Sequence, residues 1–401
     1  MPSKEFNPAD FVEKRVKEIR RVLGGERALI AVSGGVDSTV CAVLTHRAIG
    51  ENLLCVLLDD AFMREGEPER VAEVLSKPPL SLPVKIVNVR ERFLDALKGL
   101  RDAEEKRKAF RETFYKVLGE TAESEKYRFL VQGTIYADII ETAGGIKTQH
   151  NVLSQIGISP TEKYGFQVVE PIATLYKSQV RQLARHLGVP SEISERQPFP
   201  GPGLSVRVVG EITADKLEAL KKATAIAEDK LAEHKPAQFF AAVLNDEEVS
   251  EHPVSRAMKE TAACFLNLSL TGVSAKVLRD KATGIKGGER HYGEIVAVRA
   301  QTENRVSQPS VQSLVELQTE IVSGNPSVTR VFYAVHEASR KQPYLIVIRA
   351  VQTQDFITAE VAEVPWKTLR EAAEKILEVC PNVSSVYYDV TPKPPATVEM
   401  E

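Results

Sequence analysis

The sequence predicts an α/β protein: an N-terminal doubly wound parallel sheet followed by an α+β domain that contains a duplicated β-α-β unit. Three observations carry this prediction. Short apolar runs alternate with helical patterns through the first half of the chain, a glycine-rich loop follows the first of these runs, and two stretches of the second half resemble one another. At 401 residues the chain is long enough for two or three domains.

The first half begins with an amphipathic pattern that predicts a helix over residues 8–23. Apolar runs typical of buried strands lie at 28–32, 53–58, 84–89, 129–132 and 167–171, and helical patterns lie at 39–48, 71–75, 92–97, 104–118 and 177–187. Strand, helix and strand in this order favour a parallel sheet covered on both faces. The mixed charges of residues 101–112, at i, i+4 spacing, are interpreted as a solvated helix face without a binding role.

The loop after the first strand consists of Ser33, Gly34, Gly35, Val36, Asp37 and Ser38. Its glycines let the main chain approach an anion, and the amides of the following helix N-terminus point towards that anion. An aspartate beside phosphates implies a divalent cation between the two charges, so Mg²⁺ is expected. The Gly-Lys-Ser/Thr ending of a Walker loop and the third glycine of a dinucleotide fingerprint are both missing. An ordinary glycine-rich turn is the alternative explanation.

Composition excludes several classes of partner. The 52 basic and 55 acidic residues give a formal net charge of -3, so the chain has no overall positive charge to attract nucleic acid or an anionic membrane. The four cysteines are scattered without C-x-x-C spacing, and three lie in apolar runs, which predicts buried free thiols. No stretch is typical of a signal peptide or a membrane span. We therefore expect a cytoplasmic protein.

The second half begins in a segment rich in proline and glycine, residues 197–203, which predicts a stiff extended connector. We expect one domain over residues 1–195 and a second over 196–401. In the second domain, the pattern at 295–300 recurs at 345–350, and the pattern at 331–335 recurs at 386–390. The two stretches, about 295–335 and 345–390, therefore predict two β-α-β units.

These motifs together resemble the GMP synthetases, which are PP-loop ATP pyrophosphatases, and in particular their ATP pyrophosphatase subunit with its C-terminal dimerisation domain. The resemblance rests on the loop at 33–38 and on segments 132–138, 146–151, 197–204 with Arg207, and 393–401. It implies that ATP adenylates xanthosine 5'-monophosphate (XMP) at O2 and that ammonia then displaces AMP. GMP, AMP and pyrophosphate would be the products.

The resemblance also implies roles for individual residues. The residues expected to bind ATP are Ser33, Gly34, Gly35, Val36, Asp37, Ser38, Gln132 and Gly133, and Asp37 and Asp138 are expected to bind Mg²⁺. Asp37, Lys147 and His150 are expected to be catalytic, the last two on a mobile lid. The residues expected to bind XMP are Arg64, Arg207, Lys393, Val398 and Glu399.

Two partners follow from the same resemblance. The family's C-terminal domain implies a homodimer. No Cys-centred nucleophile motif precedes the loop, so, as in two-subunit members of the family, a separate glutamine amidotransferase subunit is expected to supply ammonia.

Some residues depart from the family pattern and leave alternatives open. Asp60 and Ala61 replace Asn and Gly, Gln149 replaces a second lid histidine, and the β-α-β unit is present twice. One alternative is therefore a paralogue that aminates or thiolates a different nucleobase or small acid. Another is a non-catalytic regulatory subunit that retains ATP binding and uses the doubled unit for assembly.

Overall fold

The computed structural model describes residues 6–136, 138–139, 159–250, 252, 255–302, 305–354 and 357–401. The chain divides into two compact units. Unit 1 comprises Met1–Ala96 and Ala109–Gly201, and unit 2 comprises Leu97–Lys108 and Pro202–Glu401. The chain leaves unit 1 for the last time after Gly201, within the proline- and glycine-rich segment. Nothing in the sequence indicates that residues 97–108 also belong to unit 2.

Unit 1 is built on a parallel five-stranded sheet with the strand order β3-β2-β1-β4-β5. The strands are β1 (Ala28–Ala31), β2 (Leu53–Asp59), β3 (Val84–Asn88), β4 (Phe129–Val131) and β5 (Gln167–Val169). All five coincide with predicted strands, which confirms the predicted doubly wound architecture. The strand order reverses between β1 and β4, and ligands of such sheets bind beyond the carboxyl ends of the strands at this point.

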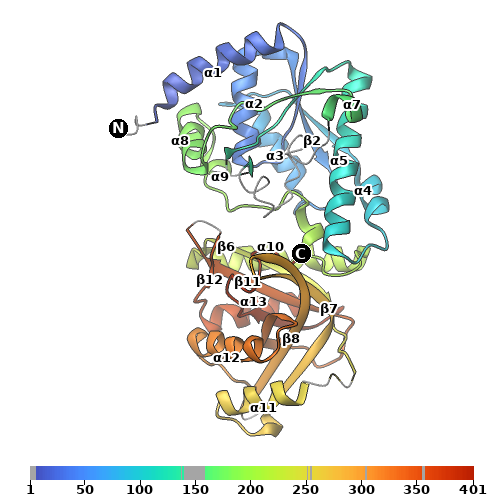
Figure 1. Cartoon of the computed structure of the whole chain (residues 1–401), viewed down its shortest axis with the longest axis vertical. Coiled ribbons are helices and arrows are strands. Elements are labelled where there is room, and N and C mark those ends of the chain that lie inside the picture. The colour runs from blue at the N-terminus through green and yellow to red at the C-terminus, as the bar shows by residue number, and fades with distance from the viewer. Residues whose placement is uncertain are drawn as a thin grey trace. The chain divides into compact units, whose positions relative to one another are not determined.

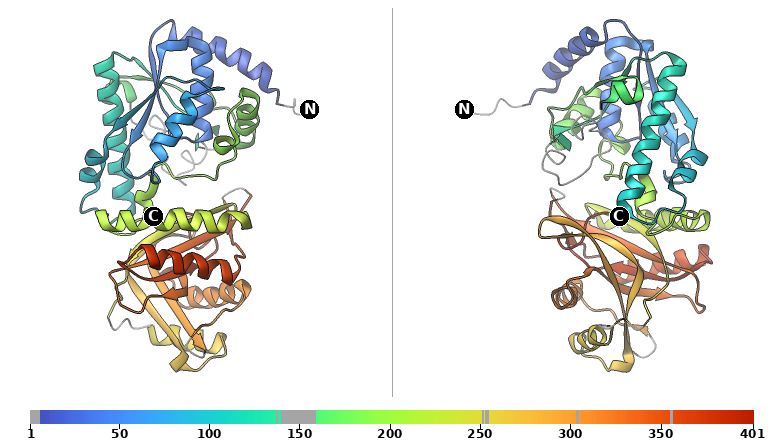
Figure 2. Two further views of the ribbon diagram at one scale, coloured as in Figure 1. Left: turned by 180° about the vertical axis from the view of Figure 1, so that it is seen from behind. Right: turned by 45° about the vertical axis from the view of Figure 1, so that its right-hand side comes forward.

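Helices cover both faces of this sheet (Figures 1 and 2). The helices of unit 1 are α1 (Pro8–Leu23), α2 (Val36–Ile49), α3 (Glu67–Ser76), α4 (Arg90–Leu97), α5 (Ala103–Glu125), α7 (Pro160–Tyr164), α8 (Lys177–Leu187) and α9 (Ser191–Ser194), with a 3-10 turn, η1, at Gly50–Asn52. The last residue of α4 and the first residues of α5 also fall in the 97–108 segment of unit 2. On one face of the sheet, Ile30 and Val131 join a core with α1, α2 and α8. On the other face, Leu29 and Leu130 are also buried, as expected for a sheet covered twice.

Unit 2 contains a mixed sheet with the order β12-β11-β13-β10-β8-β7, to which β6 and β9 add at β11 and β8. Its strands are β6 (Gln238–Asn245), β7 (Val273–Lys286), β8 (Glu289–Thr302), β9 (Arg305–Val306), β10 (Val328–Glu337), β11 (Tyr344–Gln352), β12 (Glu360–Val361) and β13 (Val383–Asp389). Its helices are α10 (Ala214–Leu231), α11 (Ser255–Phe265), α12 (Val311–Gly324) and α13 (Trp366–Val379), with 3-10 turns η3 (Gly203–Val206), η4 (Ala232–His234) and η5 (Leu270–Gly272).

Two successive strand–helix–strand units lie in this sheet. The first is β8-α12-β10 and the second is β11-α13-β13. Within each unit the two strands pair in parallel, whereas β10 and β13 pair antiparallel where the units meet. This antiparallel pair relates the units by an approximate two-fold axis, so the apolar faces of both can share one core.

Cysteines 41, 55 and 380 are buried and Cys264 is exposed, and all four thiols are free, which confirms the expectation for the three cysteines in apolar runs. Burial raises the pKa of the Cys55 thiol to about 12, so this thiol stays protonated and unreactive at neutral pH. Among the described residues, none of the helices combines the length and the apolar character that crossing a bilayer requires.

Candidate active site

The loop between β1 and α2 has the backbone of an anion site. Gly34 has a φ of 73°, and a Cβ added there would lie 2.7 Å from Cγ2 of Val71, so only glycine fits. Ser38 Oγ donates to the carbonyl of Gly35 at 3.1 Å and closes the turn. No side chain among the described residues caps the N-terminus of α2. Its first amides are therefore available to a phosphate.

The loop after β4 packs directly against this turn. A Cβ on Gly133 would lie 2.9 Å from the amide nitrogen of Ser38 and 3.0 Å from the carbonyl carbon of Asp37. The fold therefore brings together two of the predicted ATP-binding segments at the point where the strand order reverses. The side chain of Gln132, also predicted to bind ATP, donates to the hydroxyl of buried Tyr115 at 2.7 Å, so its amide supports the inner wall of the site.

Asp37 forms an ion pair that the sequence did not suggest. Lys177 Nζ lies 2.6 Å from Asp37 Oδ2, whereas Asp37 Oδ1 is buried and accepts no hydrogen bond within the described parts of the chain. Lys177 is the first residue of α8, where the helix dipole disfavours a cation. A lysine at this position was therefore a sequence signal that its side chain interacts with an acidic group outside the helix.

Asp138, the second predicted metal ligand, follows the loop after β4. One carboxylate oxygen, Oδ2, accepts from the amide of Ile135 at 3.0 Å. No cluster of three or more acidic, histidine or cysteine side chains that could hold a metal by itself occurs in the portions of the chain the structure describes. Any Mg²⁺ here would depend on phosphate oxygens for most of its ligands, as Mg²⁺ commonly does.

Arg64 belongs to a buried charge cluster beside the loop. Glu67, in the first turn of α3, is almost fully buried and accepts from the Arg64 amide at 2.8 Å. Arg64 Nη1 lies 3.3 Å from Glu67 Oε1, and Arg196 Nη2 forms a second ion pair with the same oxygen. The guanidinium of Arg64 also stacks on the ring of Phe199 at 4.2 Å. Glu67 and Arg196 had not been predicted as site residues.

This cluster predicts a pH dependence of stability. Burial on its own raises the pKa of Glu67, but Arg64 and Arg196 more than offset it, so the pKa is lowered from 4.5. A carboxyl with a lowered pKa stabilises the fold above its unfolded pKa, and this contribution is lost as the pH falls through the folded value. We expect Glu67→Gln to lower the free energy of unfolding by about 3 kcal/mol at pH 7, and by progressively less below pH 4.5.

Calorimetry from pH 7 down to pH 3.5 measures this difference. Glu73→Gln, which removes an exposed partner of Lys77 on the same helix, is the control and should leave unfolding unchanged. A difference for Glu67→Gln that stays constant over the whole pH range would contradict the expectation.

Ala61, one of the departures from the family pattern, lies in a strained turn. Its φ is 76°, where residues with a Cβ are disfavoured, and the carboxylate of the preceding Asp60 accepts from the Phe62 amide at 2.8 Å. Asp60 therefore takes part in building this turn.

We expect Ala61→Gly to raise the free energy of unfolding by about 1 kcal/mol, as measured by calorimetry. Ala72→Gly, inside α3, should have the opposite sign, because glycine disfavours a helix interior.

In unit 2, Arg207 forms an ion pair with Glu399 of the C-terminal tail, residues 393–401. It is buried, its Nε and Nη2 donate to the two oxygens of Glu399 at 2.9 Å each, and it stacks on Phe240 at 4.0 Å. Gln238 donates to the same carboxylate at 2.8 Å. Two predicted XMP-binding residues, Arg207 and Glu399, are thus brought together, and much of the Arg207 guanidinium is occupied by Glu399.

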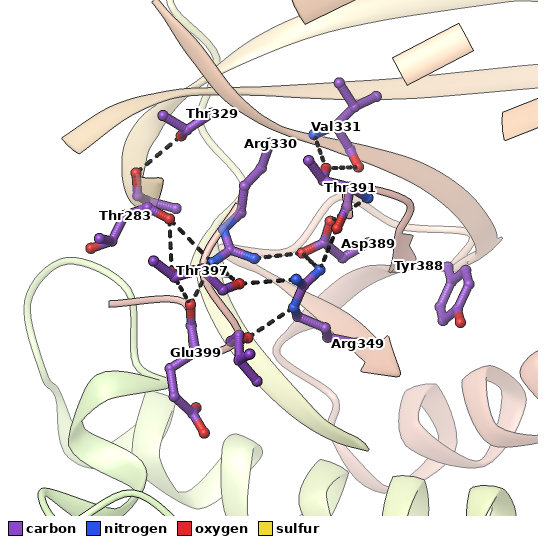
Figure 3. A network of polar contacts seen from close by, with 12 residues as sticks. Thr283, Thr329, Arg330, Val331, Arg349, Tyr388, Asp389, Thr391, Thr397 and Glu399 are labelled. Carbon is purple, nitrogen blue, oxygen red and sulfur yellow. Dashed lines mark hydrogen bonds and ion pairs between the residues drawn. The ribbon is translucent and has the colours of Figure 1, made fainter. Parts of the chain in front are cut away.

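The tail is held by two buried arginines from different repeat units (Figure 3). Arg330 on β10 and Arg349 on β11 both donate to Asp389, at 2.7 and 2.8 Å. The same guanidiniums donate to the Thr397 carbonyl, and Arg349 donates to the carbonyl of Val398 at 2.8 Å. Val398 is therefore fixed through its backbone carbonyl. Burial lowers the pKa of Arg330 to about 10, although Asp389 opposes this shift.

Lys393 is the third tail residue that was predicted to bind XMP, and its backbone forms an antiparallel bridge with Ala359. At the tail's end, the side chain of Glu401 is fully buried and forms an ion pair with Lys106, which also donates to the carbonyls of Val208 and Gly210 at 2.7 and 2.9 Å. The prediction that residues 101–112 are only a solvated face was therefore wrong for Lys106. Helical charge spacing alone does not distinguish an exposed lysine from one that meets a distant carboxylate.

The predicted lid residues Lys147 and His150, together with Gln149, lie outside the residues that the structure describes. Their expected roles stay predictions.

Comparison with known proteins shows which proteins this chain resembles. Residues 7–205 match the family model described as NAD synthase, and residues 333–400 match the one described as GMP synthase C terminal domain. A subunit of the glutamine-hydrolyzing GMP synthase of Sulfurisphaera tokodaii is 41% identical over 99% of this chain and 100% of that protein. The corresponding GMP synthase subunit of Saccharolobus solfataricus is 42% identical over 99% and 100%.

A weaker likeness among solved structures is to NMN synthetase from Francisella tularensis, with a TM-score of 0.38 and 18% identity over 50% of this chain and 79% of that one. The full-length relatives agree with the family match over residues 333–400. This chain therefore belongs to the GMP synthase family, among the subunits of its glutamine-hydrolyzing members.

Proposed function

We propose that this chain synthesises GMP from XMP, ATP and ammonia. O2 of the xanthine base attacks the α-phosphorus of ATP, a new oxygen–phosphorus bond forms, and the bond to pyrophosphate breaks. Ammonia then attacks C2 of the base, loses a proton, and displaces AMP. The observation that carries this proposal is the packing of the Gly34 turn against Gly133 at the strand-order reversal, in a chain related over its full length to GMP synthase subunits.

The loop residues would bind the phosphates that leave. The α2 amides, including that of Ser38, and the hydroxyl of Ser33 would donate hydrogen bonds, while the Ser38 hydroxyl, which donates to the Gly35 carbonyl, would keep the turn closed. Gly34 and Gly35 would leave room for the phosphates to approach. Such fixed donors stabilise negative charge as it develops on the pyrophosphate. Lys177, already within 2.6 Å of Asp37, adds a cation at the same place.

Mg²⁺ fits the chemistry of this loop. Asp37 Oδ1 is a buried carboxylate oxygen that accepts no hydrogen bond from the described residues, which is a reason to expect a cation there. Asp37 would hold Mg²⁺, with Asp138 as the second carboxylate, and the ion would neutralise charge on the phosphates. Lys147 and His150 are proposed to add positive charge when the lid closes.

Arg64, Arg207, Lys393, Val398 and Glu399 are proposed to bind the substrate nucleotide. Support differs among these residues. Arg64 is oriented by both Glu67 and Phe199, which suits a guanidinium that receives a phosphate. Arg207 is already bound to Glu399, so its first role is to hold that carboxylate in place.

Two partners are part of the proposal. The relatives are named as single subunits of a glutamine-hydrolyzing GMP synthase, so a separate glutamine amidotransferase subunit is proposed as the source of ammonia. A homodimer is proposed from the family's dimerisation domain.

The test is to incubate the purified chain with ATP, Mg²⁺, ammonium and XMP and to measure GMP, AMP and pyrophosphate. Equal amounts of the three products, none of them formed without XMP, are expected. Pyrophosphate formation with another oxo-substrate but not with XMP would indicate the paralogue. No turnover of ATP with any acceptor or donor would indicate the regulatory function, and ADP as the product would exclude both adenylating functions.

A further inference from the structure

Arg196 is a cation beside the anion loop to which neither the family motifs nor the proposed function assigns a role. It follows α9 and comes directly before the proline- and glycine-rich segment. A Cβ on Gly34 would lie 3.4 Å from Arg196 Nη1, so this guanidinium nitrogen lies against the backbone of the anion loop. The side chain is 24% exposed, which leaves it accessible to a ligand.

The opposite end of the same guanidinium is fixed. Arg196 Nη2 forms an ion pair with Glu67, whose side chain is only 3% exposed. Glu67 is itself held by the side chain and the amide of Arg64, so its carboxylate has a defined position. One nitrogen of Arg196 is therefore anchored while Nη1 is directed to the loop.

Two guanidiniums meet at Glu67. Its single carboxylate forms ion pairs with both Arg64 and Arg196, and Arg196 reaches it through Nη2. A guanidinium donates from both ends of a planar fork and binds phosphate well, and it can therefore contact a carboxylate and a phosphate at once. A lysine ammonium has no such separated donors.

We propose that Arg196 binds the terminal phosphates of ATP, and the pyrophosphate that leaves, through Nη1, and that Glu67 is the positioning residue that directs it there. This inference rests on the proposed function for the identity of the reaction. It concerns only the phosphate half of the site, so it can be tested without any acceptor.

The experiment is isothermal titration of the full chain with magnesium pyrophosphate. Losing a charged hydrogen bond should weaken binding of pyrophosphate about tenfold or more in Arg196→Met. Arg196→Lys should also weaken binding, by a smaller factor, because lysine cannot serve Glu67 and the phosphate together. Arg185→Met, which breaks an exposed ion pair with Glu195 in the same unit, is the matched control and should bind as the wild type does.

Steady-state kinetics provide the second readout. For Arg196→Lys we expect the KM for ATP to rise several-fold while the KM for XMP changes less than about twofold, a split that a purely structural role would not produce. If Arg196→Met does not fold, Arg196→Lys decides the question by itself. Wild-type affinity for pyrophosphate and a wild-type KM for ATP in Arg196→Lys would overturn the inference.

The two proposals fail separately. A wild-type chain that binds pyrophosphate but makes no GMP contradicts the proposed function, whereas the comparison of Arg196 variants still decides the inference. A wild-type chain that makes GMP and does not lose pyrophosphate affinity on substitution of Arg196 contradicts the inference alone.

Discussion

Replacing Asp37 with alanine is expected to lower the rate of GMP formation at least about a hundredfold. The substitution removes the carboxylate whose Oδ1 is buried without a hydrogen bond from the described residues, and with it the proposed contact to Mg²⁺. It also leaves Lys177 without its partner at 2.6 Å, so the balance of charge at the loop changes. The measurement is the steady-state rate of GMP and pyrophosphate formation at saturating ATP and XMP.

Stability should change little in this variant. The Asp37–Lys177 pair is partly exposed, and such pairs contribute less than about 1 kcal/mol. Asp95→Ala, which removes an exposed carboxylate from α4, is the control and should leave both rate and stability unchanged. Asp37→Ala that retains GMP formation within tenfold of the wild type would contradict a role for this carboxylate in the reaction.

Replacing Asp389 with alanine is expected to lower the free energy of unfolding of unit 2 by about 3 to 5 kcal/mol. Asp389 is the carboxylate that Arg330 and Arg349 share, and all three side chains are fully buried. Without it, two guanidiniums remain in the interior, where an unpaired charge is costly. The tail carbonyls that these arginines hold should also lose their position, so the KM for XMP should rise.

The single tryptophan makes this measurement specific. Trp366 lies at the start of α13 and its indole donates to the carbonyl of Pro309 at 2.8 Å, both within unit 2. Urea unfolding followed by its fluorescence therefore reports on unit 2. Glu374→Ala, which removes an exposed partner of Arg370, is the control and should shift the midpoint little. A shift for Asp389→Ala no larger than that of the control would show that the arginines find other partners.

The sheet of unit 1 could be predicted because its signals are local. Runs such as 28–32 and 53–58 are apolar throughout, since both faces of a parallel sheet are buried. Gly34 could be predicted as a loop residue because a close backbone approach has a chemical requirement that the sequence displays directly. Gly133 was predicted only through the resemblance of segment 132–138 to the family. The repeat in unit 2 was visible in the same way, as two copies of one pattern.

The charged partners could not be predicted in this way. Lys106 and Arg196 look like ordinary exposed cations, and Lys177 is marked only by its place at a helix N-terminus. Each of the three meets a carboxylate more than a hundred residues away in the chain. An ion pair has no periodicity, so no pattern in the sequence indicates which acid a given base will meet. The ion pair between Arg207 and Glu399 could not be predicted for the same reason, because only the folded unit brings the C-terminal tail next to Arg207.

The amino-acid sequence by itself determined the parallel sheet and the anion loop at the end of its first strand, because hydrophobic periodicity and glycine requirements act over a few neighbouring residues. The family followed from the resemblance of several motifs along the chain. Only the tertiary structure decided that Glu67 fixes Arg196 beside Gly34 and that arginines of two repeat units hold the tail through Asp389. The physical reason is that burying a charge is favourable only next to a partner of opposite sign, and the position of that partner depends on how the whole unit folds.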